Sequence, residues 1–386
     1  MNNVEKLALA YTPGVAEPCK EIEKNPEQAY ELTNKWNTVA IFTDGSRVLG
    51  LGNVGPLAAI PVMEGKAMLF KELGNIDAFP ICVAEQDHDK LIMIAKAIAP
   101  VFGGINLEDI ENPKCFFVER RLIREIDIPV FHDDQHGTAI VTLAGMINAL
   151  KVAGKEKDAR IVVNGVGAAG TAIIKLLLQY GYKNIIACDS KGIIAGTRND
   201  LTDHKWEIAA RTNPENIEGN VDVAAKGADV IISVAKANVL TEKTIAGMNS
   251  KPVVFALSNP IPDIDPNVAE KMGVYVIATG RSDYPNQINN VLAFPGVFRG
   301  ALDVRASAIS DEMKLAAAKA IAELVKEPST KNIVPPGLDK KVPYAVACAV
   351  AEKAIEQGLN KLKTTKKEAH IIIKTNLLFN KVKYNV

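Results

Sequence analysis

The sequence predicts an α/β protein built from two domains, and three observations support this prediction. The chain has 386 residues, which is more than a single hydrophobic core usually serves. Its composition, with 48% hydrophobic and 23% charged residues, is that of a globular protein. Short β-branched runs in its second half alternate with helix-like segments and polar turns, which is the order of a parallel sheet. We therefore expect an N-terminal α/β domain over residues 1–150 and a second domain over residues 151–386.

The overall charge and the cysteines narrow the class of protein. Lysine plus arginine and aspartate plus glutamate both number 45, so the net charge is zero and nothing favours a nucleic-acid partner. The five cysteines are scattered and form no C-x-x-C pair, which suggests neither a disulfide framework nor a zinc site. The start lacks a basic segment followed by an apolar run, and no stretch is apolar for long enough to cross a bilayer. We expect a cytoplasmic protein without a membrane partner.

In the N-terminal domain, the stretch "VLGLGNVGPLAA" (48–59) carries a G-x-G-x-x-G motif. Two strand-like runs around Asp44-Gly45 precede it, which is hairpin chemistry. Pro56 and Pro61 follow it, and we expect them to prevent an immediate long helix. We therefore interpret this motif as a glycine-rich turn that brings backbone close to another part of the protein, not as a nucleotide site.

Two acidic pairs lie further along the same domain. Glu108 and Asp109 sit in "GGINLEDIENP", and Asp133 and Asp134 follow an apolar run in "IPVFHDDQHGTA". Four clustered acids without a local surplus of cations would repel one another, and a divalent cation would relieve that repulsion. Oxygen ligands favour Mg²⁺ or Mn²⁺. The N-terminal domain is therefore predicted to hold a metal and a substrate.

Two other interpretations of these acidic pairs remain open: a zinc site, and a purely structural role. His132 and His136 flank the second pair, so zinc has to be considered, although the segment follows a strand and contains Gly137. Each acidic pair could also be surface charge or could cap a helix, since "DDQHGTAIVTLAGMINAL" opens one. Capping and metal binding do not exclude each other.

The second domain opens with another G-x-G-x-x-G, in "VVNGVGAAGTAI" (162–173). A β-branched strand leads into it, an amphipathic helix follows, and the next strand ends at Asp189, as a dinucleotide fingerprint requires. This predicts a Rossmann-type, doubly wound domain, with Asp189 at the ribose hydroxyls and Lys191 able to accept a 2′-phosphate, so NAD and NADP both remain open. The residues predicted to cradle the pyrophosphate are Gly165, Gly167, Ala168, Ala169 and Gly170.

Three later segments, "ADVIISVAKANVL", "KPVVFALSNPIPDID" and "GVYVIATGRSD", read as further parallel strands of this sheet. Asn259 follows the second of them, and Asn289 and Asn290 follow the third. A turn role is the common explanation for any one such asparagine, but two sets at strand ends indicate a site. Beyond Phe294 the chain reads as alanine-rich amphipathic helices that pack back on the Rossmann sheet and on a partner subunit.

Six motifs together resemble the malic enzymes, in particular the small-subunit prokaryotic branch. In chain order they are "LALAYTPGVAEPC", "VLGLGNVGPLAAIPVMEGKAMLF", "LEDI", "VFHDDQHGTA", "FALSNP" and "NQINNVLAFPG". The resemblance implies oxidation of L-malate by NAD or NADP and loss of CO₂ to give pyruvate, with Mg²⁺ or Mn²⁺, in a homodimer. It places the metal ligands at Glu108, Asp109 and Asp134 with Asp133 beside them, the catalytic lysine at Lys66, the catalytic tyrosine at Tyr11, and the substrate contacts at Arg47, Asn259, Asn289 and Asn290.

The chemistry of the reaction agrees with these residue types. Hydride leaves C2 of malate only as the hydroxyl proton is removed, so a base is required; a desolvated lysine beside a cation can be neutral near pH 7. Lys66 is that candidate, and Tyr11 would protonate C3 of the enolate left by CO₂ loss. Two alternatives remain: a non-decarboxylating NAD(P)-dependent 2-hydroxy acid dehydrogenase, and a catalytically silent nucleotide-binding sensor.

Overall fold

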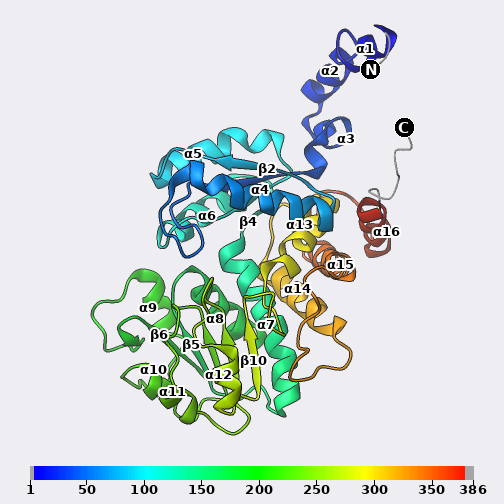
Figure 1. Cartoon of the computed structure of the whole chain (residues 1–386). Coiled ribbons are helices and arrows are strands. Elements are labelled where there is room, and N and C mark those ends of the chain that lie inside the picture. The colour runs from blue at the N-terminus through cyan, green and yellow to red at the C-terminus, as the bar shows by residue number, and fades with distance from the viewer. Residues whose placement is uncertain (1–3, 379–386) are drawn as a thin grey trace.

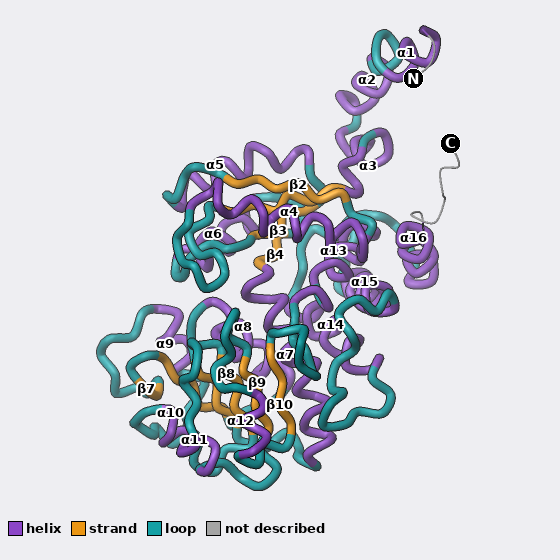
Figure 2. Tube along the Cα trace, in the orientation of Figure 1, coloured by secondary structure: helices purple, strands orange, loops and turns teal. Residues whose placement is uncertain are grey.

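The chain folds into two α/β lobes that are joined by helices, as a computed structural model shows (Figure 1). The structure describes residues 4–378. Each lobe has its own sheet, whose strands are orange in Figure 2. The predicted α/β class and its Rossmann-type second domain are thus confirmed.

The first lobe contains a four-stranded sheet in the order β2-β1-β3-β4, with every pair parallel. Its strands are β1 (Thr38–Thr43), β2 (Asp77–Cys82), β3 (Gly104–Leu107) and β4 (Val130–His132). Its helices are α4 (Gly55–Gly74), α5 (His88–Ile98), the 3-10 turn η3 (Ala99–Val101) and α6 (Lys114–Glu125). One face of the sheet packs on α5 and α6 through a buried cluster that includes Phe42, Leu91 and Val118. The other face packs on α4, so the residues after β1 and β3 open at one edge.

The stretch after β1 departs from two predictions. No hairpin forms at Asp44-Gly45, because β1 pairs in parallel with β2 and β3, and only an isolated bridge joins Val48 to Gly52. The 20-residue helix α4 begins directly at Gly55, although two prolines were expected to prevent it. Pro56 stands in the first turn, where its missing N–H has no helical partner anyway. Pro61 lies inside the helix, and the buried face through Met63 and Phe70 holds the helix together around it.

The second lobe contains a six-stranded sheet in the order β10-β9-β8-β5-β6-β7, in which only the short β7 is antiparallel. Its strands are β5 (Ile161–Asn164), β6 (Ile185–Asp189), β7 (Gly192–Ile193), β8 (Val230–Ser233), β9 (Val253–Ala256) and β10 (Val276–Thr279). Its helices are α8 (Ala168–Tyr180), α9 (Asp203–Ala209), α10 (Val221–Ala224), α11 (Glu242–Ala246) and α12 (Pro266–Lys271). The chain moves to one side of β5 for β6 and to the other side for β8, so a crevice for a ligand opens at the carboxyl end of β5.

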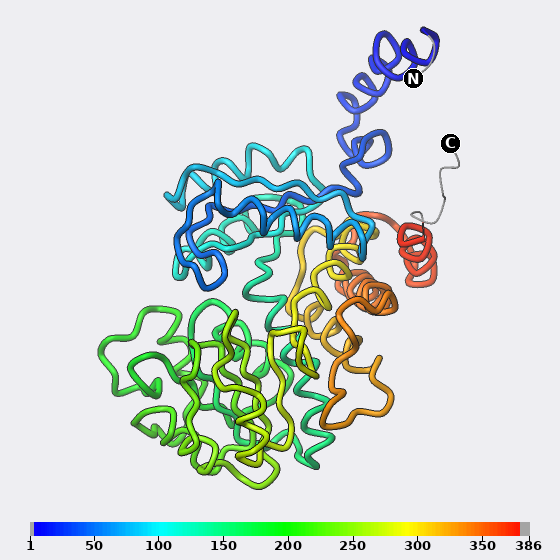
Figure 3. Tube along the Cα trace, viewed as in Figure 1, coloured from blue at the N-terminus to red at the C-terminus, as the bar shows by residue number. Residues whose placement is uncertain are grey.

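The remaining helices tie the two lobes together (Figure 3). They are α7 (Asp133–Ala153), η4 (Asn290–Leu292), α13 (Phe294–Asp303), α14 (Asp311–Leu324), α15 (Lys341–Glu356) and α16 (Lys366–Leu378). Helix α7 starts at the edge of the first sheet and packs along α8 of the second lobe. Helix α13 packs on α4 of the first lobe, and α14 packs on α7. The helices after Phe294 therefore cover both lobes, and not the Rossmann sheet alone.

A slender N-terminal arm projects away from the first lobe (Figure 1). Its elements are α1 (Val4–Ala10), α2 (Ala16–Lys24), η1 (Pro26–Gln28), α3 (Ala29–Leu32) and η2 (Asn34–Asn37). Neither α1 nor α2 contains a buried residue. Within the described residues, no helix is both long and apolar enough to span a bilayer.

Candidate active site

A buried lysine held by two carboxylates forms the centre of the site. Lys66, on the buried face of α4, is 8% exposed. Its Nζ donates to Oε1 of Glu108 at 2.7 Å and to Oδ2 of Asp133 at 2.5 Å. Glu108 follows β3 and Asp133 is the first residue of α7, so three segments far apart in sequence meet here. The Lys66 ammonium also lies 4.5 Å from the centre of the Phe294 ring, which closes the site on the side of α13.

The charges around Lys66 are unbalanced towards negative. Burial raises the pKa of Asp109 to about 7, and the neighbouring carboxylate of Asp134 adds to the rise. Burial likewise holds the pKa of Glu108 well above its usual range, with Asp134 and Asp133 repelling its charge although Lys66 opposes them. Four carboxylates surrounding one ammonium repel one another, as the sequence predicted.

A catalytic lysine base is expected to have a lowered pKa, but the pKa of Lys66 is raised. Burial alone would lower it, but the carboxylates of Asp133 and Glu108 raise the pKa of Lys66 above its ordinary value. A lysine in this arrangement is charged near pH 7. It becomes a base only when its two carboxylate partners are drawn away or neutralised.

The predicted metal ligands lie beside one another, and their donor atoms fit a hard cation. The backbone N–H of Asp109 donates to Oδ2 of Asp134 at 2.9 Å, which brings the two acidic loops together. Oδ2 of Asp109 and Oδ1 of Asp133 are buried without a hydrogen-bond partner. As the side chains stand, no three His, Cys, Asp or Glu groups among residues 4–378 converge into a closed ligand set. Orphaned carboxylate oxygens and raised carboxyl pKa values are nevertheless what a divalent cation would satisfy.

Glu119 holds the turn that carries Asp133 and Asp134, and sequence reasoning missed it. From α6, its carboxylate accepts the backbone N–H of His132 at 3.1 Å and the side-chain amide of Gln135 at 3.1 Å, and it pairs with Nε2 of His136 at 2.8 Å. Burial would raise the pKa of Glu119, but His136 and Lys314 lower it to about 2. The side chain of His136 and the backbone N–H of His132 thus hold this turn, and no three His, Cys, Asp or Glu side chains in residues 4–378 converge as a zinc site would require. No sequence pattern marked Glu119, because its partners lie in a later segment.

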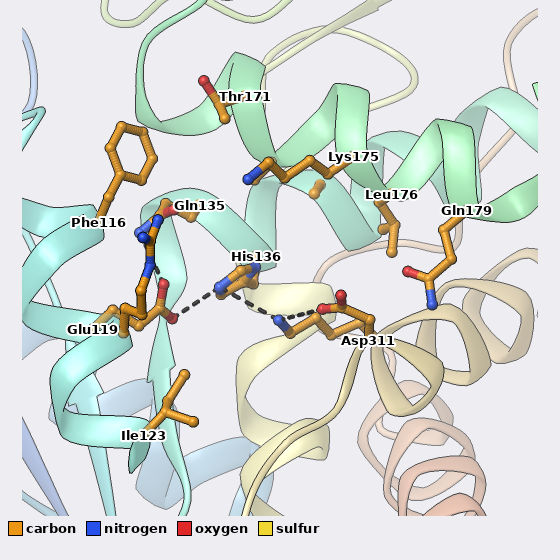
Figure 4. A pocket seen from close by; sticks show the side chains of 14 residues that line it. Phe116, Glu119, Ile123, Gln135, His136, Thr171, Lys175, Leu176, Gln179 and Asp311 are labelled. Carbon is orange, nitrogen blue, oxygen red and sulfur yellow. Dashed lines mark hydrogen bonds and ion pairs between the residues drawn. The ribbon is translucent and has the colours of Figure 1, made fainter. Parts of the chain in front are cut away.

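Glu119 and His136 also line a cavity next to the Lys66 cluster. Figure 4 shows Glu119, His136 and Asp311 on the wall of a cavity of about 230 Å³ between α6, α7, α8 and α14. Lys314 pairs there with Asp311 at 2.9 Å. Nζ of Lys314 also lies 3.4 Å from Nε2 of His136, so the start of α7 contacts both α6 and α14.

Of the three predicted asparagines, only Asn290 contacts the acidic cluster around Lys66. Asn290 belongs to the cluster, because its side-chain amide donates to Oδ2 of Asp133 at 3.1 Å and its oxygen accepts from Thr138. The side-chain oxygen of Asn289 caps the following 3-10 turn through the N–H of Val291, which is the turn role considered from the sequence. Asn259 is exposed after β9, where a Cβ on Gly280 would lie 2.5 Å from its amide nitrogen.

The first glycine motif reaches across the cleft, as its interpretation predicted. A Cβ on Gly50 would lie 3.1 Å from the backbone oxygen of Asn259, so this turn approaches the loop after β9 in the other lobe. The backbone N–H of Arg47 donates to the backbone oxygen of Asp109 at 3.0 Å. The Arg47 side chain is exposed at the edge of the acidic cluster. This loop therefore borders the acidic cluster that contains Asp109.

The structure does not bring Tyr11 to the other predicted residues of its own chain. Tyr11 follows α1 on the N-terminal arm and is 66% exposed. Figure 1 shows this arm pointing away from the lobes that hold Lys66. Its catalytic role stays a prediction.

The second glycine motif has the geometry of a pyrophosphate cradle. Gly165 has a φ of 103°, and a Cβ there would lie 2.9 Å from the backbone of Val234. A Cβ on Gly170 would lie 2.0 Å from the backbone oxygen of Gly165, so only glycine permits the tight turn. The N-terminus of α8, at Ala168 and Ala169, carries no side-chain cap and leaves its N–H groups for an anion. The residues present therefore fit a dinucleotide.

Fold and site together define a nicotinamide-dependent oxidoreductase with an acidic, lysine-containing centre between its lobes. The malic enzyme N-terminal domain matches residues 1–123, and the malic enzyme NAD binding domain matches residues 135–355. The chain belongs to the malic enzyme family.

Known proteins over nearly the whole length agree with this assignment. The chain is 53% identical over 366 residues to a bifunctional malic/malolactic enzyme of Bacillus subtilis, which covers 94% of this chain and 89% of that protein. It is 47% identical to an NADP-dependent malic enzyme of Halomonas elongata, over 92% of this chain and 87% of that protein. The crystal structure of malic enzyme from Pyrococcus horikoshii superimposes with a TM-score of 0.95 at 50% identity, covering 99% of this chain and 91% of the other.

Proposed function

We propose that this protein catalyses the oxidative decarboxylation of L-malate to pyruvate and CO₂ with reduction of NAD or NADP, using Mg²⁺ or Mn²⁺. The observation that carries the proposal is the buried Lys66, which lies between Glu108 and Asp133 where α4, the end of β3 and the start of α7 meet. Neither alternative from the sequence explains it. A silent sensor needs no buried cation between two acids, and a simple dehydrogenase needs no second acidic pair.

Glu108, Asp109 and Asp134 would hold the metal. When bound, the cation supplies Lewis-acid polarisation of the C2 oxygen of malate, which favours loss of CO₂ from the resulting keto acid. Its charge would also engage Glu108 and so weaken the hold of that carboxylate on Lys66. The fit rests on the orphaned oxygens of Asp109 and Asp133 and on the raised carboxyl pKa values.

The chain's own residues would then move the protons. Lys66 would first pass one ammonium proton to Oδ2 of Asp133, which lies 2.5 Å away, and its neutral Nζ would then take the proton of the C2 hydroxyl. Asn290 keeps Asp133 in place from the other side at 3.1 Å. Gly165, Gly167 and Gly170 would hold the pyrophosphate of the coenzyme, which would supply the acceptor for the hydride of C2. The carbonyl formed at C2 accepts the electron pair of the broken C3–C4 bond, and C3 must finally be protonated.

We infer that Tyr11 of the partner subunit supplies this last proton in a homodimer. The arm that bears Tyr11 exposes a row of large apolar side chains, which favours burial against another protein surface. They are Val4, Leu7, Leu9, Tyr11 and Val15. A second copy of this chain is the partner that supplies an active site incomplete without a tyrosine.

Mixing two inactive variants tests the base and the shared site together. Lys66→Ala and Tyr11→Phe should each lower turnover of L-malate with Mn²⁺ strongly, whereas Lys71→Ala, an exposed lysine at the end of the same helix, should not. After subunit exchange, half of the dimers carry one intact site, so activity should return to about a quarter of wild type. Full activity of Lys66→Ala would refute the base, and no recovery on mixing would refute the shared site.

We also propose a cytoplasmic location. The absence of a spanning helix among residues 4–378 and the burial of the free thiols of Cys115, Cys188 and Cys348 are consistent with it. Fractionation of cells that produce the protein checks this directly, and recovery of the protein with membranes would contradict it.

A further inference from the structure

The cavity between α6, α7, α8 and α14 has more cations than acids on its wall (Figure 4). Its charged lining residues are Arg120, Lys175, Lys314, Glu119 and Asp311. Three cations against two acids leave one net positive charge. The volume of about 230 Å³ leaves room for a small molecule at this place.

The protein itself already engages both acids of the cavity. Glu119 accepts three hydrogen bonds from the residues at the start of α7. Oδ1 of Asp311 accepts Nζ of Lys314 at 2.9 Å. The unused hydrogen-bonding capacity at this wall therefore belongs to donors, which favours an anion as the ligand.

Lys314 is almost buried and still keeps unused donors. Its side chain is 9% exposed, and its Nζ donates to Asp311. Nε2 of His136 lies 3.4 Å from this Nζ, but it gives its hydrogen to the ionised Glu119 at 2.8 Å and has no lone pair left for Lys314. An ammonium has three N–H groups, so two of those on Lys314 find no acceptor within residues 4–378. An anion in the cavity would satisfy them.

The other two cations stand on opposite walls. Arg120 on α6 is exposed and forms no hydrogen bond or ion pair with any residue of the described chain. Lys175 on α8 pairs with Glu207 at 2.7 Å, and because these side chains are 40% and 44% exposed the pair is weak. Helix α6 belongs to the first lobe and α8 to the second, so an anion held between them contacts both lobes.

The uncharged part of the wall is largely apolar, and this sets the class of ligand. It includes Phe116, Ile123, Ala139, Ala172 and Leu176. An inorganic ion would leave this surface uncovered, whereas an organic anion would bury its apolar part there.

We propose that this cavity binds a small organic anion that joins one carboxylate or phosphate group to an apolar body. The charged group lies at Lys314 and Arg120, and the apolar body lies against Ile123 and Leu176. Neither Lys66 with its carboxylate partners nor the glycines of the coenzyme cradle line the cavity, so the inference does not depend on the proposed function.

Calorimetry with benzoate and phenyl phosphate, on protein free of metal and coenzyme, tests the proposal. The two probes share a ring and differ in the charged group, so the tighter one identifies the group that the site prefers. Benzyl alcohol, which has the ring without a charge, should bind at least about tenfold more weakly than that probe, because the charge-assisted hydrogen bonds are lost.

Variants locate the bound anion. Lys314→Met should weaken binding of the preferred probe at least about tenfold. It should remain folded, because the side chain of Asp311 is 64% exposed and no buried charge is left unpaired. Arg120→Met, at an exposed position, should weaken binding in the same direction. Lys319→Met and Arg124→Met, exposed on the same two helices and outside the cavity, are the matched controls and should bind as wild type does.

A cavity-filling variant separates a defined site from general attraction of anions to a positive surface. Ala172→Leu enlarges a side chain of the wall without changing a charge, so it should also weaken binding of the preferred probe. Failure of wild type to bind either anion would overturn the inference. Unchanged affinity in the Lys314→Met, Arg120→Met double variant, or in Ala172→Leu, would place the anion elsewhere and overturn it as well.

Discussion

Replacing Gly137 by alanine should displace the carboxylate that holds Lys66. Gly137 lies in the second turn of α7, and a Cβ there would meet Oδ1 of Asp133 at 1.9 Å. Real Cβ atoms do not approach closer than 3.0 Å, so the carboxylate must move by at least 1.1 Å. Asp133 has no exposed surface, and its other oxygen binds both Lys66 and Asn290. The movement therefore reaches the proposed base.

The size of the effect follows from that displacement. A misplacement of about 1 Å in a catalytic group can cost about a hundredfold in rate, and we expect kcat with L-malate to fall by about that factor. The substitution should at the same time favour the helical conformation of α7, since alanine is more favourable than glycine in a helix by about 1 kcal/mol. The variant should consequently remain folded while losing activity.

The assay compares kcat from reduced-coenzyme absorbance with the midpoint of thermal unfolding. Gly65→Ala is the matched control, since Gly65 precedes Lys66 in α4 and a Cβ there meets no atom within 4 Å. Gly65→Ala should keep wild-type kcat. Unchanged kcat in Gly137→Ala would refute the role given to the position of Asp133, and so would an equal loss in both variants.

Three further changes test the site and its support. Asp134→Asn should weaken Mn²⁺ binding by at least about tenfold, because a charged ligand is lost. The electron paramagnetic resonance signal of free Mn²⁺ measures this affinity, and an unchanged affinity would show that Asp134 is not a metal ligand. Glu119 has a pKa of about 2 against an ordinary 4.5, so its ionised form stabilises the fold above pH 4.5, and this is lost as pH falls towards 2. The difference in unfolding free energy between wild type and Glu119→Gln should shrink by up to about 3 kcal/mol between pH 6 and pH 2 in urea titrations, and a constant difference argues against this. Arg299 of α13 forms a fully buried ion pair with Asp303, so Arg299→Met removes the cation that balances this carboxylate and should cost about 3–5 kcal/mol. Asp303→Leu in the same chain should largely restore the stability.

The fold of the second lobe could be predicted because its signals are local. The strand before Gly165, the helix after it and the strand ending at Asp189 each show in a short window of sequence, and the structure has β5, α8 and β6 there. The stretch after β1 was mispredicted because local proline rules ignore tertiary packing. Burial of Met63 and Phe70 stabilises α4 through Pro61.

The site could be predicted only in part. Acidic pairs and strand-end asparagines are visible in sequence, but the partners of Lys66 depend on how α4, β3 and α7 meet. Glu119 and Arg198 were missed because each acts through residues that the fold, not the sequence, places beside it. Asp189 is the clearest case, since the sequence places it at the end of a strand, as the structure has it, while its carboxylate oxygens already accept from Arg198 and Lys205.

The most direct test of the account measures products in one reaction mixture of wild-type protein, L-malate and Mn²⁺, with NAD and NADP in separate runs. Reduced coenzyme, pyruvate and lactate are quantified at the same times. We expect equal amounts of reduced coenzyme and pyruvate, no lactate, and no reaction when the metal is chelated. Reduced coenzyme without pyruvate would indicate a simple dehydrogenase, and lactate without net reduced coenzyme would indicate a malolactic reaction; either result contradicts the account.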